Sequence, residues 1–267
     1  MQNESTYATP AAPGGLSAFW LKVIAITGMF LQHMALALPG AFAYEFEVFL
    51  QISGGFTMPI MMFLLVEGFR ATSNLDKYLK RVGLFAAISM VPHLFALGSG
   101  FNVMFTLLFG LLILRIRRSY GNAPRFWLAF IFITLASFPF DWGIVGPICI
   151  FLLYEIRNEK ARRILMPVCF AIGTIVYSML ITAALGLIID MNAVYTSSAA
   201  MFFPVGSLLT IPLLLMYKGK RGQPMKWFFY VFYPAHFVVL AVISIVMGKN
   251  NLINMVQQIA HELSVLF

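Results

Sequence analysis

The sequence predicts an all-α, polytopic transmembrane helical bundle of about nine spans, and three observations carry this prediction. First, the chain of 267 residues is 61% hydrophobic and only 10% charged, whereas soluble domains carry about 25% charged residues. Second, its apolar residues form nine segments, at about 19–38, 48–69, 82–97, 101–114, 126–140, 142–156, 164–189, 201–217 and 227–247. Third, Lys and Arg residues gather after every second segment.

The apolar segments differ in length, and several are shorter than the ~20 residues that a full membrane span requires. Two interpretations of the short segments stay open at this point. They are either spans in a locally thinned bilayer or re-entrant pieces that pack inside the bundle.

The basic clusters predict the orientation of the chain. They begin at Arg70, Arg115, Arg157 and Lys218, after the second, fourth, sixth and eighth segments. Because cytoplasmic loops are enriched in Lys and Arg, these four loops and the N-terminus are expected in the cytoplasm. The loops between them carry acidic residues instead, so the C-terminus is expected outside.

Three regions follow from this pattern. Residues 1–17, rich in Ala, Pro, Thr and Gly, are expected to be a disordered cytoplasmic tail. Residues 18–249 form the predicted transmembrane domain. Residues 250–267 alternate apolar and polar side chains at helical spacing, which predicts an amphipathic helix at the outer interface.

The first segment carries the strongest functional signal. Lys22 lies near its start and His33 follows on the same helix, roughly 16 Å further along the axis at 1.5 Å per residue. This is about half of a hydrocarbon core of ~30 Å. An ionisable residue at that depth indicates a functional site. His236, near the middle of the last segment, is a second candidate, while His93 is expected to be structural.

Four further polar residues lie within or beside apolar segments, and each has a structural alternative. Glu67 is a candidate site residue, or it forms an ion pair with Arg70 one turn later. Asp141 and Asn102 are either functional or N-terminal caps of the sixth and fourth segments. Tyr233 either serves the site or packs with its hydroxyl group bonded to a neighbouring helix.

Several classes of function find no motif in this sequence. It contains no phosphate-binding P-loop, no GxSxG nucleophile elbow and no HExxH zinc motif. Four histidines on separate segments without cysteine partners predict no metal site. No basic–aromatic motif points to nucleic acid, and the basic clusters are explained by topology and by anionic lipid headgroups.

A set of motifs, in order, resembles the TraX family. The motifs are LKVIAITGMFLQH, MPIMMFLLVEGF, KYLKR, NVMFTLLFGLL, FDWGIVG, GKRG and FFYVFYPAHFVVL. They cover about residues 19–245, and the closing run is the most distinctive. TraX proteins are named for N-terminal acetylation of conjugative pilin, and the family resembles a wider group of polytopic membrane acyltransferases that use acyl-CoA.

This resemblance implies an integral membrane acyltransferase of the bacterial inner membrane, with His33 as the catalytic histidine. It implies site roles for Lys22, Glu67, Asn102, Tyr233 and His236. Two positions depart from the family: Gln32 stands where an acidic residue is common, and Gly55 where an arginine is common. One interpretation is that the two charges pair in other members and were lost together.

The expected reaction moves an acetyl or other acyl group from cytosolic acyl-CoA to an amine or hydroxyl group. The acceptor is a pilin or other surface-protein N-terminus, or an envelope glycan. His33 would act as the base, since imidazole titrates near neutral pH. The CoA phosphates would bind basic residues near the cytoplasmic face, with Lys22, Arg70, Lys77 and Arg81 as candidates. Direct transfer and an acyl-histidine intermediate are both compatible with this arrangement.

The alternative class of function is not enzymatic. A transporter of small solutes or lipids would use the same intramembrane histidines as proton-relay or substrate-binding groups. A membrane scaffold for pilus assembly would need the fold without the chemistry.

Overall fold

The computed structural model describes residues 15–98, 101–186, 201–249, 253–254 and 256–257. Regular structure among these residues is helical, apart from one isolated bridge between Leu16 and Tyr217, so the all-α class is confirmed. The helices are α1 (Ala18–Ala37), α2 (Tyr44–Gly54), α3 (Thr57–Ala71), α4 (Leu75–Leu97), α5 (Val103–Tyr120), α6 (Pro124–Ala136), α7 (Val145–Glu155), α8 (Glu159–Gly186), α9 (Phe203–Leu215) and α10 (Lys226–Val246).

Both predicted terminal regions lie largely outside the described residues. Residues 1–14 and most of 250–267 are not among them. The last residues of the predicted N-terminal tail are ordered, however. The Leu16 N–H donates to the Met216 carbonyl at 2.8 Å, and the Lys218 N–H donates to the Leu16 carbonyl at 2.9 Å. The tail is therefore tied to the chain that follows α9 before α1 begins.

Each predicted apolar segment contains a helix, but the ends of the helices do not coincide with the ends of the apolar segments. α4 and α8 begin earlier than their apolar segments, because Asp76 and Glu159 occupy their first turns and acidic residues there interact favourably with the helix dipole. The second segment is divided into α2 and α3. Pro59 lies just inside α3, and it lacks the N–H that would bond the Gly55 carbonyl in an unbroken helix. That carbonyl instead accepts a hydrogen bond from the Ser207 hydroxyl at 3.3 Å.

Five helical stretches of the described chain have the length and apolar character to cross a membrane. They are Ala18–Ala37, Tyr44–Ala71, Leu75–Leu97, Glu159–Leu180 and Trp227–Val246. α6, α7 and α9 are apolar but shorter, and α5 carries Arg115, Arg117 and Arg118 near its end. The chain is thus a multi-pass membrane protein, and the count of nine spans stays a prediction.

The outward faces of several helices are strongly apolar. On α6, Leu128, Ile131, Phe132 and Leu135 are all exposed, Phe132 by 75%. α8 and α10 present similar faces with Ile172, Met179, Val242 and Val246. Soluble monomers rarely expose contiguous apolar patches of this kind, so these faces are suited to contact lipid.

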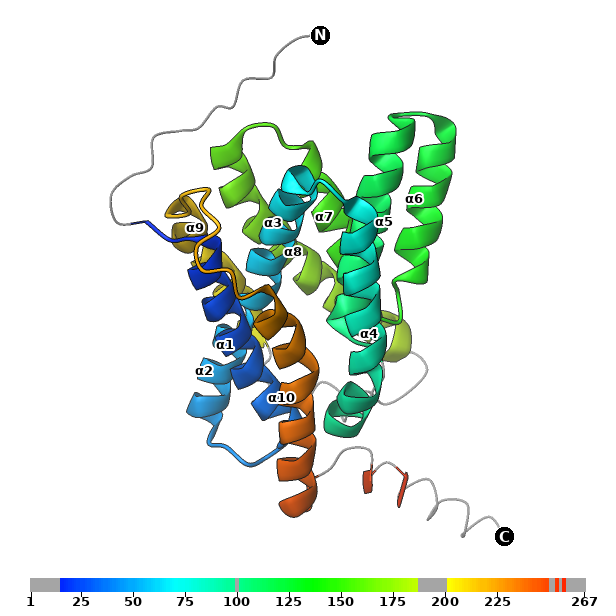
Figure 1. Ribbon diagram of the computed structural model, residues 1–267. Coiled ribbons are helices and arrows are strands. Elements are labelled where there is room, and N and C mark those ends of the chain that lie inside the picture. The colour runs from blue at the N-terminus through cyan, green and yellow to red at the C-terminus, as the bar shows by residue number, and fades with distance from the viewer. Residues whose placement is uncertain (1–14, 99–100, 187–200, 250–252, 255, 258–267) are drawn as a thin grey trace.

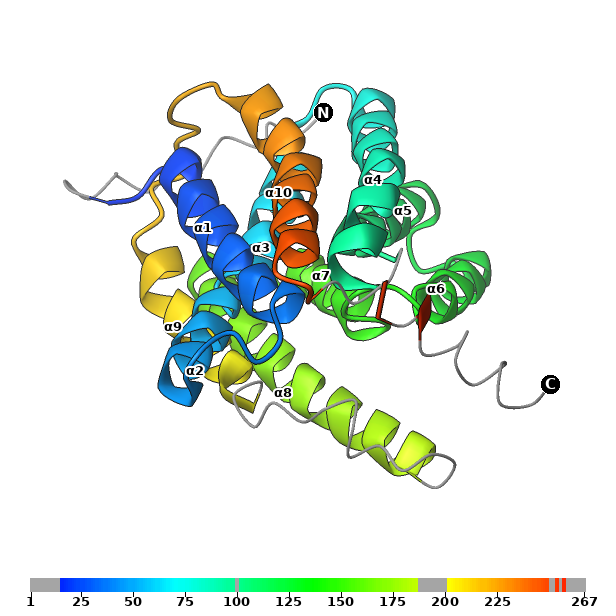
Figure 2. The same ribbon diagram turned by 90° about the horizontal axis from the view of Figure 1, so that it is seen from below.

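The arrangement of the helices brings the first segment next to the last. Figures 1 and 2 both show α10 between α1 and α4, and α10 contacts each of them. α3 lies behind this layer and packs against α1, α5, α7, α8 and α9. Side chains from α1, α3, α4, α5 and α10 therefore face a common interior.

The four basic clusters lie at one end of the bundle, the upper end in Figure 1, which we call the basic end. Ion pairs join the connections there: Arg115 pairs with Asp76 at 2.8 Å, and Arg117 pairs with Glu155 at 2.8 Å. The main-chain N–H groups of Ala18 and Phe19 donate to the carbonyls of residues 220 and 221 at 2.9 and 3.1 Å. The four clusters that alternate with apolar segments along the sequence therefore lie together at one end of the folded bundle (Figure 1).

Two glycines allow α2 and α9 to pack backbone against backbone. A Cβ atom on Gly206 would overlap the Ile52 carbonyl oxygen, and a Cβ on Gly55 would overlap the Phe203 carbonyl oxygen. Small residues at such crossings are typical of helix packing in membranes. Gly55 therefore leaves no room for a larger side chain in this packing. Gln32 donates to the Gln51 side chain at 3.2 Å.

We predict that Gly206→Ala will destabilise the protein, because the new methyl group meets rigid backbone rather than a movable side chain. Overpacking of this kind costs about 1–3 kcal/mol. Gly83→Ala in α4 is the matched control, since its nearest neighbour would be a Leu108 methyl at an ordinary 3.6 Å. Thermal unfolding in detergent measures both variants. Equal midpoints for the two variants would contradict the close approach of α2 and α9.

Candidate functional site

Two histidines from opposite ends of the sequence meet inside the bundle. The His33 Nδ1 atom on α1 lies 2.9 Å from the His236 Nε2 atom on α10. Their ring planes differ by only 12° and the centroids lie 5.1 Å apart, which suits a hydrogen bond in the plane of the rings, and both residues are buried. The structure therefore brings together the two histidines that the sequence placed at membrane depth.

The hydrogen bonds around this pair assign its tautomers when both rings are neutral. The His236 Nδ1 atom lies 3.1 Å from the Phe232 carbonyl oxygen, which only accepts, so Nδ1 carries the proton. The His236 Nε2 atom is then an acceptor, and the His33 Nδ1–H donates to it. This leaves the lone pair of His33 on Nε2. The arrangement presents His33 as an oriented base.

His93 from α4 belongs to the same cluster. The buried Phe237 ring contacts all three histidines, with centroid distances of 4.7 Å to His33, 3.9 Å to His236 and 4.8 Å to His93. The His93 Nε2 atom also lies 3.4 Å from an Asp141 carboxylate oxygen. Asp141 therefore pairs with a histidine and does not cap the helix that follows it, since the residue preceding α7 is Ile144.

Asn102 is a helix cap, as one of the two interpretations of the sequence predicts. Its side-chain oxygen accepts from the Met104 N–H at 3.0 Å, and its amide donates to the Ala86 carbonyl at 3.0 Å. Asn102 thus fixes the start of α5 against α4. It thereby positions Val103, which faces the interior next to the histidine cluster.

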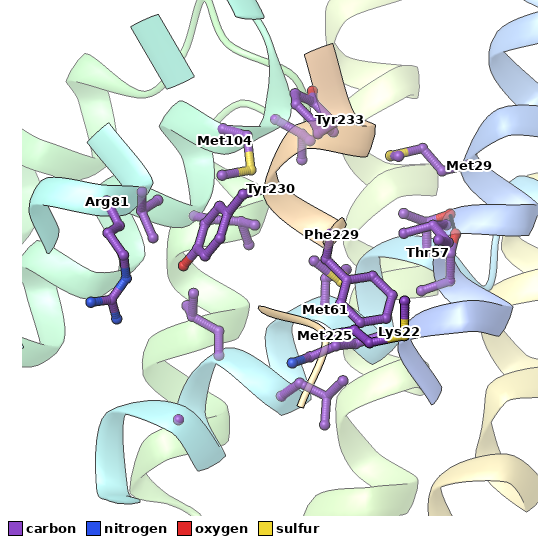
Figure 3. A pocket seen from close by; sticks show the side chains of 18 of the residues that line it. Lys22, Met29, Thr57, Met61, Arg81, Met104, Met225, Phe229, Tyr230 and Tyr233 are labelled. Atoms are coloured by element: carbon purple, nitrogen blue, oxygen red, sulfur yellow. Dashed lines mark hydrogen bonds between the residues drawn. The ribbon is translucent and has the colours of Figure 1, made fainter. Parts of the chain in front are cut away.

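A cavity of about 280 Å³ extends into the bundle from the basic end. Lys22, Arg81 and Arg221 line it together with Tyr78, Tyr230 and Tyr233, and five methionines contribute much of its apolar wall. Figure 3 shows Met29 and Thr57 on one wall and Arg81 with Tyr230 on the opposite wall. The Arg81 Nε atom is buried and has no hydrogen-bond partner among the described residues. We call this space the basic-end cavity.

A second cavity, of about 300 Å³, lies on the other side of the same residues. Its lining includes His33, Gln32, Asp141, Trp142 and Tyr177. Met29, Thr57 and Val103 line both cavities. We call this second space the histidine cavity. The two cavities thus share a wall, and His33 lines only the second of them.

The structure separates the predicted site residues into two groups. Lys22, Arg81 and Tyr233 line the basic-end cavity, and the buried Tyr233 hydroxyl lies beside the Val103 main-chain N–H. Arg70 and Lys77 line neither cavity. Arg70 instead donates to the Tyr154 carbonyl at 2.8 Å.

Glu67 lines neither cavity and has a partner far along the chain. Its carboxylate accepts from Arg162 of α8 at 2.7 Å. The Arg162 side chain is almost fully buried, and its Nε and Nη1 atoms have no hydrogen-bond partner among the described residues. Glu67 is therefore the counter-charge of a buried guanidinium. The pairing with Arg70 that the sequence suggested does not form.

Arg221 was not among the predicted site residues, and His93 was expected to be structural. Arg221 lines the basic-end cavity because the pairing of Leu16 with Tyr217 returns the α9–α10 connection to the start of α1. Its position in the GKRG motif was the available signal. His93 joins the histidine cluster, and its expected location at the same end of the bundle as Asp141 could have indicated the pair. Among the described residues, no group of three metal-ligating side chains is arranged to hold a metal ion.

We predict that Glu67→Gln will destabilise the protein by roughly 2 kcal/mol, because it leaves the buried Arg162 charge without a counter-ion. Glu155→Gln is the control. It removes the partner of Arg117 in a more exposed pair, where a loss below ~1 kcal/mol is expected. Thermal unfolding in detergent compares the two variants. A Glu67→Gln variant as stable as the wild type would contradict the structural role.

Comparison with known proteins places the chain in a family. Residues 17–244 match the family described as TraX protein. A protein of Dichelobacter nodosus named "Probable fimbrial assembly protein FimC, serogroup H1" is 33% identical over 244 residues, which cover 84% of this chain and 94% of that protein. No solved structure matches the chain significantly. The matched residues contain both cavities and the histidine cluster, and the chain belongs to the TraX family.

Proposed function

We propose that this protein is a membrane acyltransferase of pilus or fimbrial assembly. It moves an acetyl group from acetyl-CoA to an amine or hydroxyl acceptor, such as the N-terminus of a pilin. The observation that carries the proposal is that two cavities share a wall of three residues, with His33 lining the second cavity. The fimbrial name of the D. nodosus relative supports the cellular context.

The basic-end cavity suits an acyl-CoA donor. CoA combines anionic phosphates with a long, uncharged pantetheine arm. Lys22, Arg81 and Arg221 line it and offer positive charge. Guanidinium groups bind phosphates through charge-assisted hydrogen bonds. The pantetheine arm would lie along the methionines and tyrosines, with the thioester towards Met29.

The histidine cavity suits the acceptor, because it reaches His33 from the other side. The acceptor nitrogen or oxygen attacks the thioester carbonyl carbon while His33 Nε2 takes its proton. The carbon–sulfur bond then breaks, and His33 returns the proton to the CoA sulfur. Tyr233 lines the donor side of the site, and in this mechanism its hydroxyl would donate to the acyl oxygen.

The predicted topology gives these cavities a direction. If the basic end faces the cytoplasm, as the positive-inside rule expects, the donor enters from the compartment where acyl-CoA is made. The acceptor is then modified at the opposite face of the inner membrane. His236 orients His33 from α10 and is a positioning residue in this mechanism.

We predict that His33→Ala will lower acetyl transfer by at least about 100-fold, because a general base contributes about 10²–10⁴-fold. The assay is transfer from radiolabelled acetyl-CoA to a peptide N-terminus in proteoliposomes. His236→Asn keeps an acceptor oxygen for the His33 Nδ1–H, and we expect it to retain more activity than His33→Ala. A cooperative unfolding transition in detergent and a monodisperse elution profile serve as the folding control for each variant. Wild-type turnover by His33→Ala would contradict the assignment and favour a transporter or scaffold.

We further predict that replacing Lys22, Arg81 and Arg221 with Gln will weaken CoA binding and flatten its dependence on salt. The physical reason is the loss of three cations from the cavity that receives the phosphates. The matched control replaces Arg70 and Lys77, which belong to the same basic end but line neither cavity. Thermal stabilisation by CoA at two salt concentrations measures both. An equal loss of CoA affinity in both variants would mean that these residues act only through the overall positive charge of the basic end.

A further inference from the structure

Three residues form the common wall between the two cavities: Met29, Thr57 and Val103. We call them the partition. Met29 and Val103 are buried. Met29 lies one helical turn before His33 on α1, so the two side chains share a face of the helix. Whatever passes from the basic-end cavity towards His33 has to pass these three side chains.

Two members of the partition are held in place. The Thr57 hydroxyl donates to the Ala25 carbonyl at 3.0 Å, which ties the start of α3 to α1. Val103 follows Asn102, whose side chain is bonded to both α4 and α5. Val and Thr are also β-branched, which restricts their rotation. Neither side chain is therefore free to move aside.

Met29 differs from its two neighbours. Its side chain is unbranched and has three rotatable bonds, and among the described residues none forms a hydrogen bond with its thioether. In Figure 3 it lies at the deep end of the basic-end cavity beside Thr57. Met29 is thus the movable part of a wall that is otherwise rigid. The space that its movement opens is limited to roughly the volume of its own side chain.

We propose that this partition selects the acyl group of the donor by size, with Met29 as the specificity-determining residue. The proposal rests on the proposed acyl transfer and deepens it by naming the donor class as short-chain acyl thioesters. The thioester carbon has to reach the neighbourhood of His33, so its acyl substituent has to fit between Met29, Thr57 and Val103. An acetyl group adds a single methyl at this point, whereas a longer chain needs more space than the movement of Met29 opens beside Thr57 and Val103.

The test compares acetyl-, butyryl- and hexanoyl-CoA as donors for the wild type, Met29→Ala and Val103→Ala. Both substitutions remove carbons from the partition. We expect the ratio of butyryl to acetyl transfer to rise at least tenfold, since a pocket discriminates one methylene by about 10–200-fold. Met61→Ala is the matched control, because Met61 lines only the basic-end cavity. Its ratio should stay near that of the wild type.

A binding arm separates failure of this inference from failure of the proposed function. S-ethyl- and S-hexyl-CoA thioethers are inert, and thermal stabilisation reports their binding without turnover. The inference predicts that the wild type prefers the ethyl compound and that Met29→Ala loses the preference. A donor profile unchanged in both partition variants, or changed equally by Met61→Ala, would overturn the inference alone. A wild type that neither binds the thioethers nor transfers any acyl group would overturn the proposed function and the inference with it.

Discussion

The hydrogen bond between His33 and His236 is the interaction on which the proposed site depends. It joins α1 to α10, which lie near opposite ends of the sequence. The lipid around the bundle offers no hydrogen-bond partner, so buried polar groups have to pair with each other. The His33 Nδ1–H and the His236 Nε2 lone pair satisfy each other, and the Phe232 carbonyl fixes which nitrogen of His236 carries the proton. Other histidine orientations would leave a buried donor or acceptor unmet, at a cost of about 1–3 kcal/mol. The same bond that stabilises the helix pair therefore also orients the His33 imidazole, the proposed base.

The surrounding bundle keeps this pair accessible from two directions. α3 stands behind α1 and α10, and the interruption between α2 and α3 lets the start of α3 approach α1 through Thr57. Pro59 causes this interruption by removing a helical donor, and Ser207 of α9 satisfies the freed carbonyl. The close approach of Gly55 and Gly206 completes the contact. The break between α2 and α3 thus positions Thr57, one of the three residues that line both cavities.

Much of the fold could be predicted from the sequence, because hydropathy and charge act locally. The nine apolar segments are helical, the basic clusters lie at one end, and Asn102 caps its helix. The pairing of side chains could not be predicted in the same way. Glu67 had a plausible neighbour in Arg70, but the structure pairs it with Arg162, whose buried charge needs a counter-ion. Only the packing of α8 against α3 decides between them.

The candidate site shows the same division. Depth along a helix identified His33 and His236 separately, but their contact depends on how α1 and α10 pack. Arg221 was missed because its place depends on the return of a loop to the start of α1. The family resemblance suggested acyl transfer as the reaction of His33. The two cavities suggest from which directions the donor and the acceptor would approach it. The position of Met29 in the wall between the two cavities could not be predicted from the sequence. A methionine in an apolar helix usually serves only to pack the core.

The central claim is that the donor enters at the basic end and the acyl group leaves at the other. Proteoliposomes of one orientation, with radiolabelled acetyl-CoA on one side and a peptide with a free N-terminus on the other, test it most directly. We expect label on the peptide only when acetyl-CoA faces the basic end. Transfer to a peptide on the same side as the donor, or from a donor at the opposite end, would contradict the account.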